Sequence, residues 1–133
     1  METNHLVVGI DLGTSNCTLS YGWANTDKEI KTLKIEQLVS KGRKHGRESF
    51  PAVMYIPSKE EEKSGDYCLE GAPAAPWVLG TAAKERCIDS PNRVISSAKS
   101  WLVHPEVGSM DDALPWNSDI QNKKSAQEVT CNY

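Results

Sequence analysis

The sequence predicts an α/β fold in which an antiparallel β-meander, as part of a mixed β-sheet, packs against helices. Two observations lead to this class. The first half of the chain carries short runs of aliphatic and β-branched residues separated by small polar residues, as strands and turns do. From residue 81 onward, alanines, lysines and apolar residues recur at helical spacing. With 133 residues, the chain is long enough for one domain with its own core.

Three strands are expected in the first 39 residues. The short aliphatic run Leu6–Leu12 predicts a strand buried on both faces. Small polar residues at 13–16 predict a turn, and residues 17–23 alternate between apolar and polar as a second strand does. After another turn, Leu33 and Ile35 alternate in a third. Consecutive strands joined by short turns are antiparallel neighbours, which makes these three a meander.

The middle of the chain is expected to contain loops and one longer strand. The basic run at 40–48 is more typical of a solvated loop than of an anion site. Residues 50–57, "FPAVMYIP", predict a strand that begins and ends at an edge or bulge, because prolines bracket it. The acidic residues at 58–66 predict a surface turn, and residues 67–69 a short strand.

Helices are expected after residue 80. Thr81 can cap a helix that runs through Ile88 and is closed by Pro91. A second helix is predicted over 94–102, where apolar residues form one stripe. The stripe consists of Val94, Ile95, Ala98, Trp101 and Leu102. In this pattern Trp101 is expected in the core.

The end of the chain is expected to combine a loop with a last helix. Residues 108–124 resemble a loop, held down by the apolar triplet at 114–116. Ser125 precedes Glu128 by three residues, the pattern of a capping box. A helix is therefore predicted from Ser125.

Composition excludes several classes of protein. The net charge of −3 argues against a general nucleic-acid binder, which is normally basic. No apolar run reaches 18 residues and no secretory signal is visible, so neither a membrane span nor export is expected. The four cysteines are widely spaced and form no metal-ligand pattern with the three histidines. These features predict a reduced, metal-free cytoplasmic protein in which Cys17 is a buried small residue.

The stretch "LVVGIDLGTSNCTLSYG" at residues 6–22 places a carboxylate and a glycine turn at the end of a strand. Backbone amides in such a turn can face a phosphate, and glycine permits close approach. The candidate phosphate-binding residues are Gly13, Thr14, Ser15 and Asn16. Asp11 can hold Mg²⁺ through its water shell. The alternative for Asp11 is a carboxylate that caps the turn.

Three segments together resemble a known family. "VGIDLGTSNC" is similar to the first phosphate loop of the DnaK-type (seventy-kilodalton heat-shock) chaperones. "LGTAAKERCIDSPNRVISSAKSWL" is similar to that family's A-A-K and later A-K helices, and "RESFPAVMYI" to the Arg-containing segment and strand between them. The resemblance covers roughly residues 6 to 105. Ser100 replaces a basic residue of the family and residues 106–124 differ from it, which suggests a divergent branch.

The resemblance implies a fold and an activity. The fold is part of an actin-like (ribonuclease H-like) ATPase lobe, and residues 1–133 correspond to the N-terminal portion of a chaperone nucleotide-binding domain. The second lobe and the peptide-binding domain have no counterpart. The cofactors are ATP and Mg²⁺, and the partners are unfolded client proteins and co-chaperones. Asp11 and Lys99 are the catalytic candidates, with Lys99 reaching the γ-phosphate and orienting the attacking water.

Other interpretations remain open at this point. Lys99 can be a surface lysine beside a packed stripe. The whole protein can be a small-molecule (sugar) kinase of the same superfamily, or a degenerate chaperone relative that acts as an interaction module. Because one wall of a cleft surrounds little of a ligand, we expect this chain to bind ATP weakly or not at all and not to turn it over. Open strand edges predict self-association.

Overall fold

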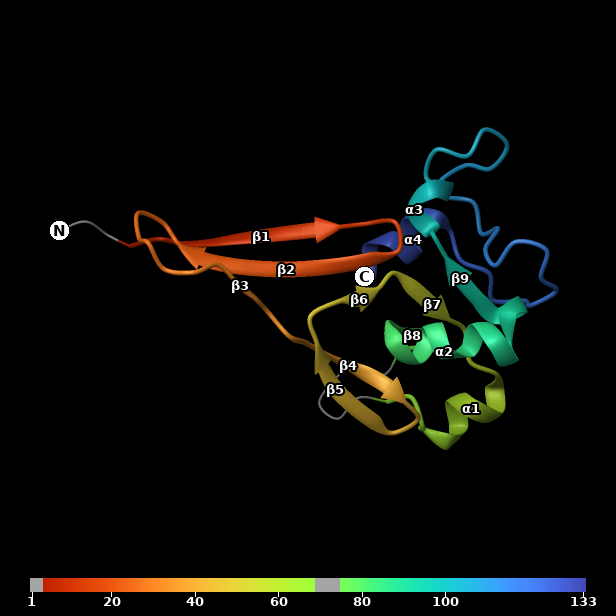
Figure 1. Ribbon diagram of the computed structural model, residues 1–133. Helices are drawn as coiled ribbons and strands as arrows, with labels where there is room; N and C mark the ends of the chain where they lie inside the picture. The colour runs from red at the N-terminus through yellow and green to blue at the C-terminus, as the bar shows by residue number, and fades with distance from the viewer. Residues whose placement is uncertain (1–3, 69–74) are drawn as a thin grey trace.

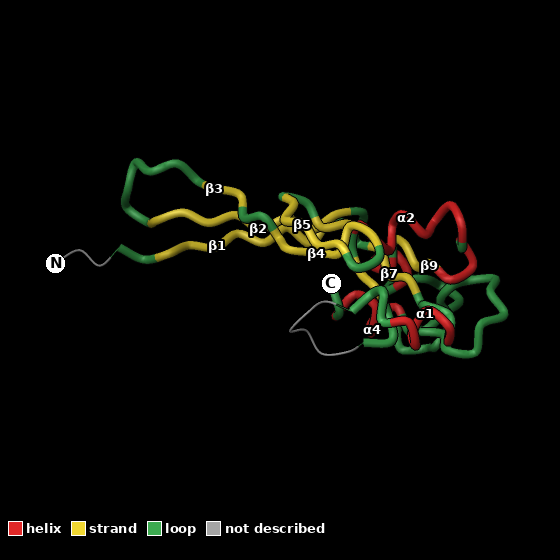
Figure 2. The backbone as a smooth tube through the Cα atoms, turned by 90° about the horizontal axis from the view of Figure 1, so that it is seen from below, coloured by secondary structure: helices red, strands yellow, loops and turns green. Residues whose placement is uncertain are grey.

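The computed structural model describes residues 4–68 and 75–133. It shows an α/β protein whose described strands form three antiparallel sheets in place of one mixed sheet. The α/β class predicted from the sequence is confirmed. An arm of three strands extends from a body that holds the helices and the other strands (Figures 1 and 2).

The arm matches the predicted meander in its first two strands. It consists of β1 (Leu6–Leu12), β2 (Asn16–Trp23) and β3 (Lys31–Thr32), in the order β1-β2-β3 with antiparallel neighbours. The third strand, predicted around Leu33 and Ile35, is placed differently, because the strand of the arm covers Lys31–Thr32 and Ile35 begins β4 (Ile35–Ser40) of another sheet. The expected burial of β1 on both faces is wrong, because all seven residues are exposed. The strand lies at the edge of the arm, which extends away from the body (Figure 1).

The predicted strand at 50–57 is divided between two sheets. Its first part, β6 (Phe50–Pro51), pairs with β2 and so attaches the arm to the body. Its second part, β7 (Val53–Tyr55), is the centre of the sheet β8-β7-β9, with β8 (Val78–Leu79) and β9 (Val94–Ser96) on either side. All three residues of β7 are buried.

The basic segment is a strand, so the loop predicted at 40–48 is wrong. β4 (Ile35–Ser40) and β5 (Arg43–Arg47) form an antiparallel hairpin. Gly42 has φ +67°, the left-handed conformation that closes a tight hairpin turn. Four of the five residues of β5 are exposed, and the fifth is Gly46, so the charges are solvated as expected although the backbone is paired.

The acidic turn predicted at 58–66 is a helix, α1 (Lys59–Ser64). The Glu61 amide donates to Ser58 Oγ, and the Glu61 carboxylate accepts from the Ser58 amide. This is a capping box, and its S-x-x-E spacing is visible in the sequence. Gly65, with φ +70°, ends the helix. Residues 67–68 are not a strand, and Leu69, the end of the strand predicted there, lies outside the described residues.

The helix predicted from Thr81 is confirmed as α2 (Thr81–Asp89), but its cap is not the Thr81 side chain. Gly80 is the residue before the helix, and Gln37 of β4 supplies the capping oxygen: Gln37 Oε1 accepts from Thr81 N over 2.9 Å and from Thr81 Oγ1 over 2.8 Å. A short 3-10 helix, η1 (Pro91–Arg93), follows, so Pro91 closes α2 as predicted.

The helix predicted over 94–102 begins as a strand. Val94–Ser96 pair with β7 as β9, and only α3 (Ala98–Trp101) is helical. Both Val94 and Ile95 are β-branched, and they meet an open edge of the central strand β7. The helical expectation for 94–97 is therefore wrong, although Ile95 and Ala98 are buried in the core.

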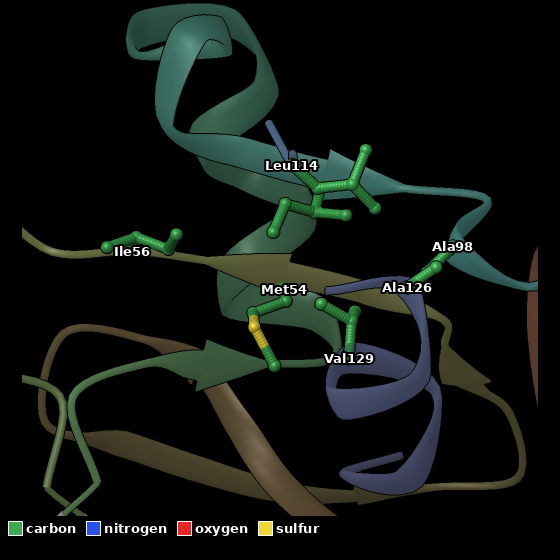
Figure 3. Close-up of a cluster of buried hydrophobic side chains, with 7 residues drawn as sticks. Met54, Ile56, Ala98, Leu114, Ala126 and Val129 are labelled. Atoms are coloured by element: carbon green, nitrogen blue, oxygen red, sulfur yellow. The ribbon is translucent and has the colours of Figure 1, made fainter. Parts of the chain in front are cut away.

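The last helix is confirmed as α4 (Ala126–Cys131), with Ser125 Oγ accepting from the Glu128 amide over 3.1 Å. Residues 108–124 are irregular except for a bridge between Leu114 and Lys124. One core cluster joins the sheet, α3, α4 and this segment, and Figure 3 shows Met54 of β7 beside Val129 of α4. Its buried members are Met54, Ile56, Ile95, Ala98, Leu114, Ala126 and Val129.

Candidate functional site

The candidate site lies at the turn between β1 and β2, where the arm meets the body (Figure 1). Asp11 is the penultimate residue of β1, exposed and paired with Thr18. A Cβ on Gly13 would lie 2.5 Å from the backbone oxygen of Asn16. Because that oxygen is fixed by the turn, the turn requires glycine at this position.

The tip of the turn is fastened to the body. The Ala52 amide donates to the Ser15 carbonyl oxygen over 2.9 Å, and Ser49 Oγ donates to Asn16 Oδ1 over 3.2 Å. The carboxamide oxygen of Asn16 is thus occupied, which leaves its NH₂ group as the part that can donate to a ligand. The turn that carries the predicted phosphate-binding residues is therefore fixed relative to the central sheet.

Lys99 of α3 reaches this turn. Its Nζ donates to the Leu12 carbonyl oxygen over 2.7 Å, although the two residues are 87 positions apart in sequence. The structure therefore brings Lys99 to the same end of β1 as Asp11. The ion pairs found among the described residues do not include one between these two side chains.

Cys17 lies at the same end of the arm, directly across from Leu12. It is paired with Leu12 and 7% exposed, which confirms the prediction of a buried small residue. Burial raises the pKa of the Cys17 thiol, and the Asp11 carboxylate raises it further, while the Lys99 ammonium and the Gly13 amide oppose the rise.

The turn is not part of two cavities found in the described part of the chain. Cavities of about 630 Å³ and 550 Å³ lie elsewhere, the first lined by residues such as Trp77 and the second by residues such as Arg93. Neither is lined by Asp11, Lys99 or the turn. Among residues 4–68 and 75–133, no three acidic, histidine or cysteine side chains gather to hold a metal.

A partly buried polar cluster was not foreseen from the sequence. Tyr55 Oη donates to Glu61 Oε2 over 2.5 Å, and Arg86 Nη2 donates to Glu61 Oε1 over 3.1 Å. The Arg86 guanidinium also lies 5.0 Å from the centre of the Tyr55 ring. The capping box at Ser58 could have placed Glu61, but no local signal connects it with Arg86. The cluster joins α1, α2 and β7.

An aromatic group was also not foreseen. Trp101 stacks on His104 with ring centres 4.6 Å apart, and Trp116 lies 5.2 Å from Trp101. Trp101 packs against the main core, as predicted, while Trp116 is 48% exposed.

Comparisons with known proteins give no family. No protein-family model matches the chain, and no curated protein matches it. Within the described part of the chain, no helix combines the length and apolar character that a membrane crossing needs. The functional assignment therefore depends on the residues at the root of the arm and on their geometry.

Proposed function

We propose that this chain supplies the first phosphate-binding hairpin of an ATP-binding, ATP-hydrolysing chaperone of the DnaK type, in an actin-like (ribonuclease H-like) lobe. The observation that carries the proposal is the hydrogen bond from Lys99 Nζ to the Leu12 carbonyl oxygen. It places a cation at the end of the strand that holds Asp11, next to the glycine turn. In this proposal residues 1–133 form the N-terminal portion of the nucleotide-binding domain.

The turn is the part that would receive the phosphates. Backbone amides of Thr14, Ser15 and Asn16, with the free NH₂ group of Asn16, are the donors. Gly13 would contribute by letting the phosphates approach the backbone closely, since its own amide faces the Cys17 thiol. Asp11 would hold Mg²⁺ through water, which its single exposed carboxylate fits because Mg²⁺ commonly keeps several waters. The ion would neutralise phosphate charge when bound.

Lys99 already lies beside the turn and can move to a bound phosphate. Its ammonium donates to a neutral carbonyl oxygen, whereas hydrogen bonds to an ionised acceptor such as a phosphate are stronger. Lys99 would therefore transfer from Leu12 to the phosphate and offset the charge that is redistributed in phosphoryl transfer.

The open geometry limits what the chain does alone. Contacts come from one wall only, whereas pockets surround most of a small ligand. Binding is therefore expected to be weak, without turnover. The same proposal includes client proteins and co-chaperones as partners and a cytoplasmic location, for which the four free cysteines are the support.

The test is an NMR titration of the isotope-labelled chain with Mg-ATP up to millimolar concentration. We expect shifts confined to residues 11–17 and to Lys99, and their loss in Lys99→Met. Lys84→Met is the matched control, because Lys84 is an exposed helical lysine on α2. The absence of shifts at the turn, or their persistence in Lys99→Met, would overturn the proposed site.

Calorimetry separates the site from the expectation of weak binding. An open, one-sided site predicts no micromolar binding of Mg-ATP to the chain. A micromolar dissociation constant would contradict that expectation while leaving the site itself in place, provided that Lys99→Met weakens it.

A second function is supported by the arm. The exposed apolar strand β1 is what an interaction module offers to a partner. This is the non-enzymatic alternative. No observation on the described residues favours the sugar-kinase alternative.

A further inference from the structure

The outer edge of β1 is open. Within the described residues, β1 pairs with β2 alone, and all seven of its residues are exposed. Figure 1 shows β1 along the border of the arm, with its C-terminal end reaching the body near α3 and the rest of the strand extending away from it. An edge strand of this length presents unpaired amide and carbonyl groups to another strand.

The two faces of the arm differ. Leu6, Val8, Ile10 and Leu12 lie on one face, across from Trp23, Tyr21, Leu19 and Cys17. The opposite face holds Val7, Gly9 and Asp11, across from Gly22, Ser20 and Thr18. Any strand added to the edge must keep apolar side chains on the first face.

We propose that β1 pairs antiparallel with β1 of a second copy of this chain, about a two-fold axis through Gly9. In this register Val8 lies opposite Ile10 of the second copy, and both are on the apolar face. Val7 lies opposite Asp11 of the second copy, and the two Gly9 residues face each other. The result is one sheet in the order β3-β2-β1-β1-β2-β3, with β6 of each copy still paired to β2, and its apolar face is continuous across the two arms.

This register follows from the residues of β1. If the pairing of the two β1 strands were shifted by one residue, apolar residues of one copy would lie opposite polar-face residues of the other. Centring on Gly9 pairs the whole strand, whereas centring on Val8 or Ile10 pairs fewer residues. The two Asp11 carboxylates oppose valines and not each other, and the two bodies lie at opposite ends of the joined arms. Leu12 already accepts from Lys99, so Val7 to Asp11 form the centre of the contact.

The predicted dimer is weak. Pairing of one edge buries less than the roughly 800 Å² per partner of a standard interface. We therefore expect a dissociation constant on the order of 100 µM.

Charge at Val7 tests the register. Val7 is 54% exposed and its partner on β2 is Gly22, so new side chains fit the monomer. Val7→Lys would face Asp11 of the second copy and tighten the dimer about two- to thirty-fold, because each dimer gains two opposite-charge pairs. Val7→Asp would weaken it by a similar factor. Sedimentation over a concentration series measures both.

The control for charge is Ile88, which is 87% exposed on α2. Ile88→Lys and Ile88→Asp should leave the dissociation constant within about two-fold of that of the parent chain. A chain that stays monomeric at millimolar concentration, or association that ignores the sign of the charge at Val7, would overturn the proposal.

A cysteine at the axis tests the pairing directly. A Cβ on Gly9 meets nothing nearer than 4.0 Å, and opposite Cα atoms in antiparallel pairs lie at about 4.5–5.5 Å, within disulfide range. In a background with Cys68, Cys87 and Cys131 changed to Ser, Gly9→Cys should form covalent dimers under mild oxidation, and Ile88→Cys should not. Equal cross-linking of both would refute the two-fold contact. No nucleotide is used, so this proposal and the phosphate site fail separately.

Discussion

At the scale of single residues, Glu61 joins three elements through its carboxylate. Burial opposes its ionisation, but hydrogen bonds from the Ser58 amide and Tyr55 hydroxyl, with the charge of Arg86, hold the pKa of Glu61 below its ordinary value of 4.5. The carboxylate thus caps α1 and binds α2 and β7 at once. Local sequence identifies the cap but not the other two contacts.

Glu61→Gln should lower the free energy of unfolding at pH 7 by about 1–3 kcal/mol, because it removes charged hydrogen bonds from a largely buried site. Since folding lowers the pKa, the carboxylate's contribution is complete above pH 4.5 and is lost as the pH falls through the folded-state value. The difference between parent and variant should therefore shrink at acidic pH.

Urea unfolding at pH 7, 5 and 3 measures this difference. Glu62→Gln is the control, because Glu62 is the exposed neighbour on the same helix. A Glu61→Gln deficit that is equal at all three pH values would show that the charge has no part in it.

At the scale of elements, Gln37 connects two parts of the body. It is 2% exposed on β4, and its Nε2 donates to the Ser49 carbonyl oxygen while its Oε1 caps α2. Gly80 provides the room, since a Cβ there would lie 2.7 Å from Gln37 Oε1. Helix α2 is thus capped by a residue 44 positions away.

Gln37→Leu should reduce the free energy of unfolding by about 1–3 kcal/mol, because the Thr81 amide and the Ser49 carbonyl would lose their buried partner. Chemical denaturation followed by far-UV circular dichroism gives the value. Gln121→Leu, at an exposed position, should change stability by less than about 0.5 kcal/mol. Equal effects of the two substitutions would argue against the capping role.

At the scale of the whole molecule, the arm and the body differ in burial. All of β1 is exposed, whereas all of β7 is buried between the two core clusters. Segments with few buried apolar contacts open at lower free energy than the core. The arm is therefore expected to open locally more easily than the body. The candidate site lies at the root of the arm, where it joins the body.

Amide hydrogen exchange should show this difference. In dilute solution, amides of β1 should exchange at least about tenfold faster than those of β7, since opening the arm exposes little core. Raising the protein concentration should slow exchange in β1 but not in β7 if the edge pairs with a second copy. Equal protection of the two strands in dilute solution would contradict the division into arm and body.

The amino-acid sequence by itself determined the features that depend on neighbouring residues. The hairpin of β1 and β2, the start of α2 at Thr81 and the Ser125 cap of α4 follow from alternation, turn residues and capping patterns. Each of these is specified within a few residues along the chain, so no knowledge of distant segments is needed.

Tertiary structure alone decided the features that depend on a distant partner. Residues 94–96 are a strand because β7 offers an edge, and the basic segment is a strand because β4 does. β1 is exposed because burial requires an element to pack on it, which alternation cannot supply. Likewise, only folding brings Lys99 to the end of the strand that holds Asp11. The contact joins residues 87 positions apart, so no local sequence pattern specifies it.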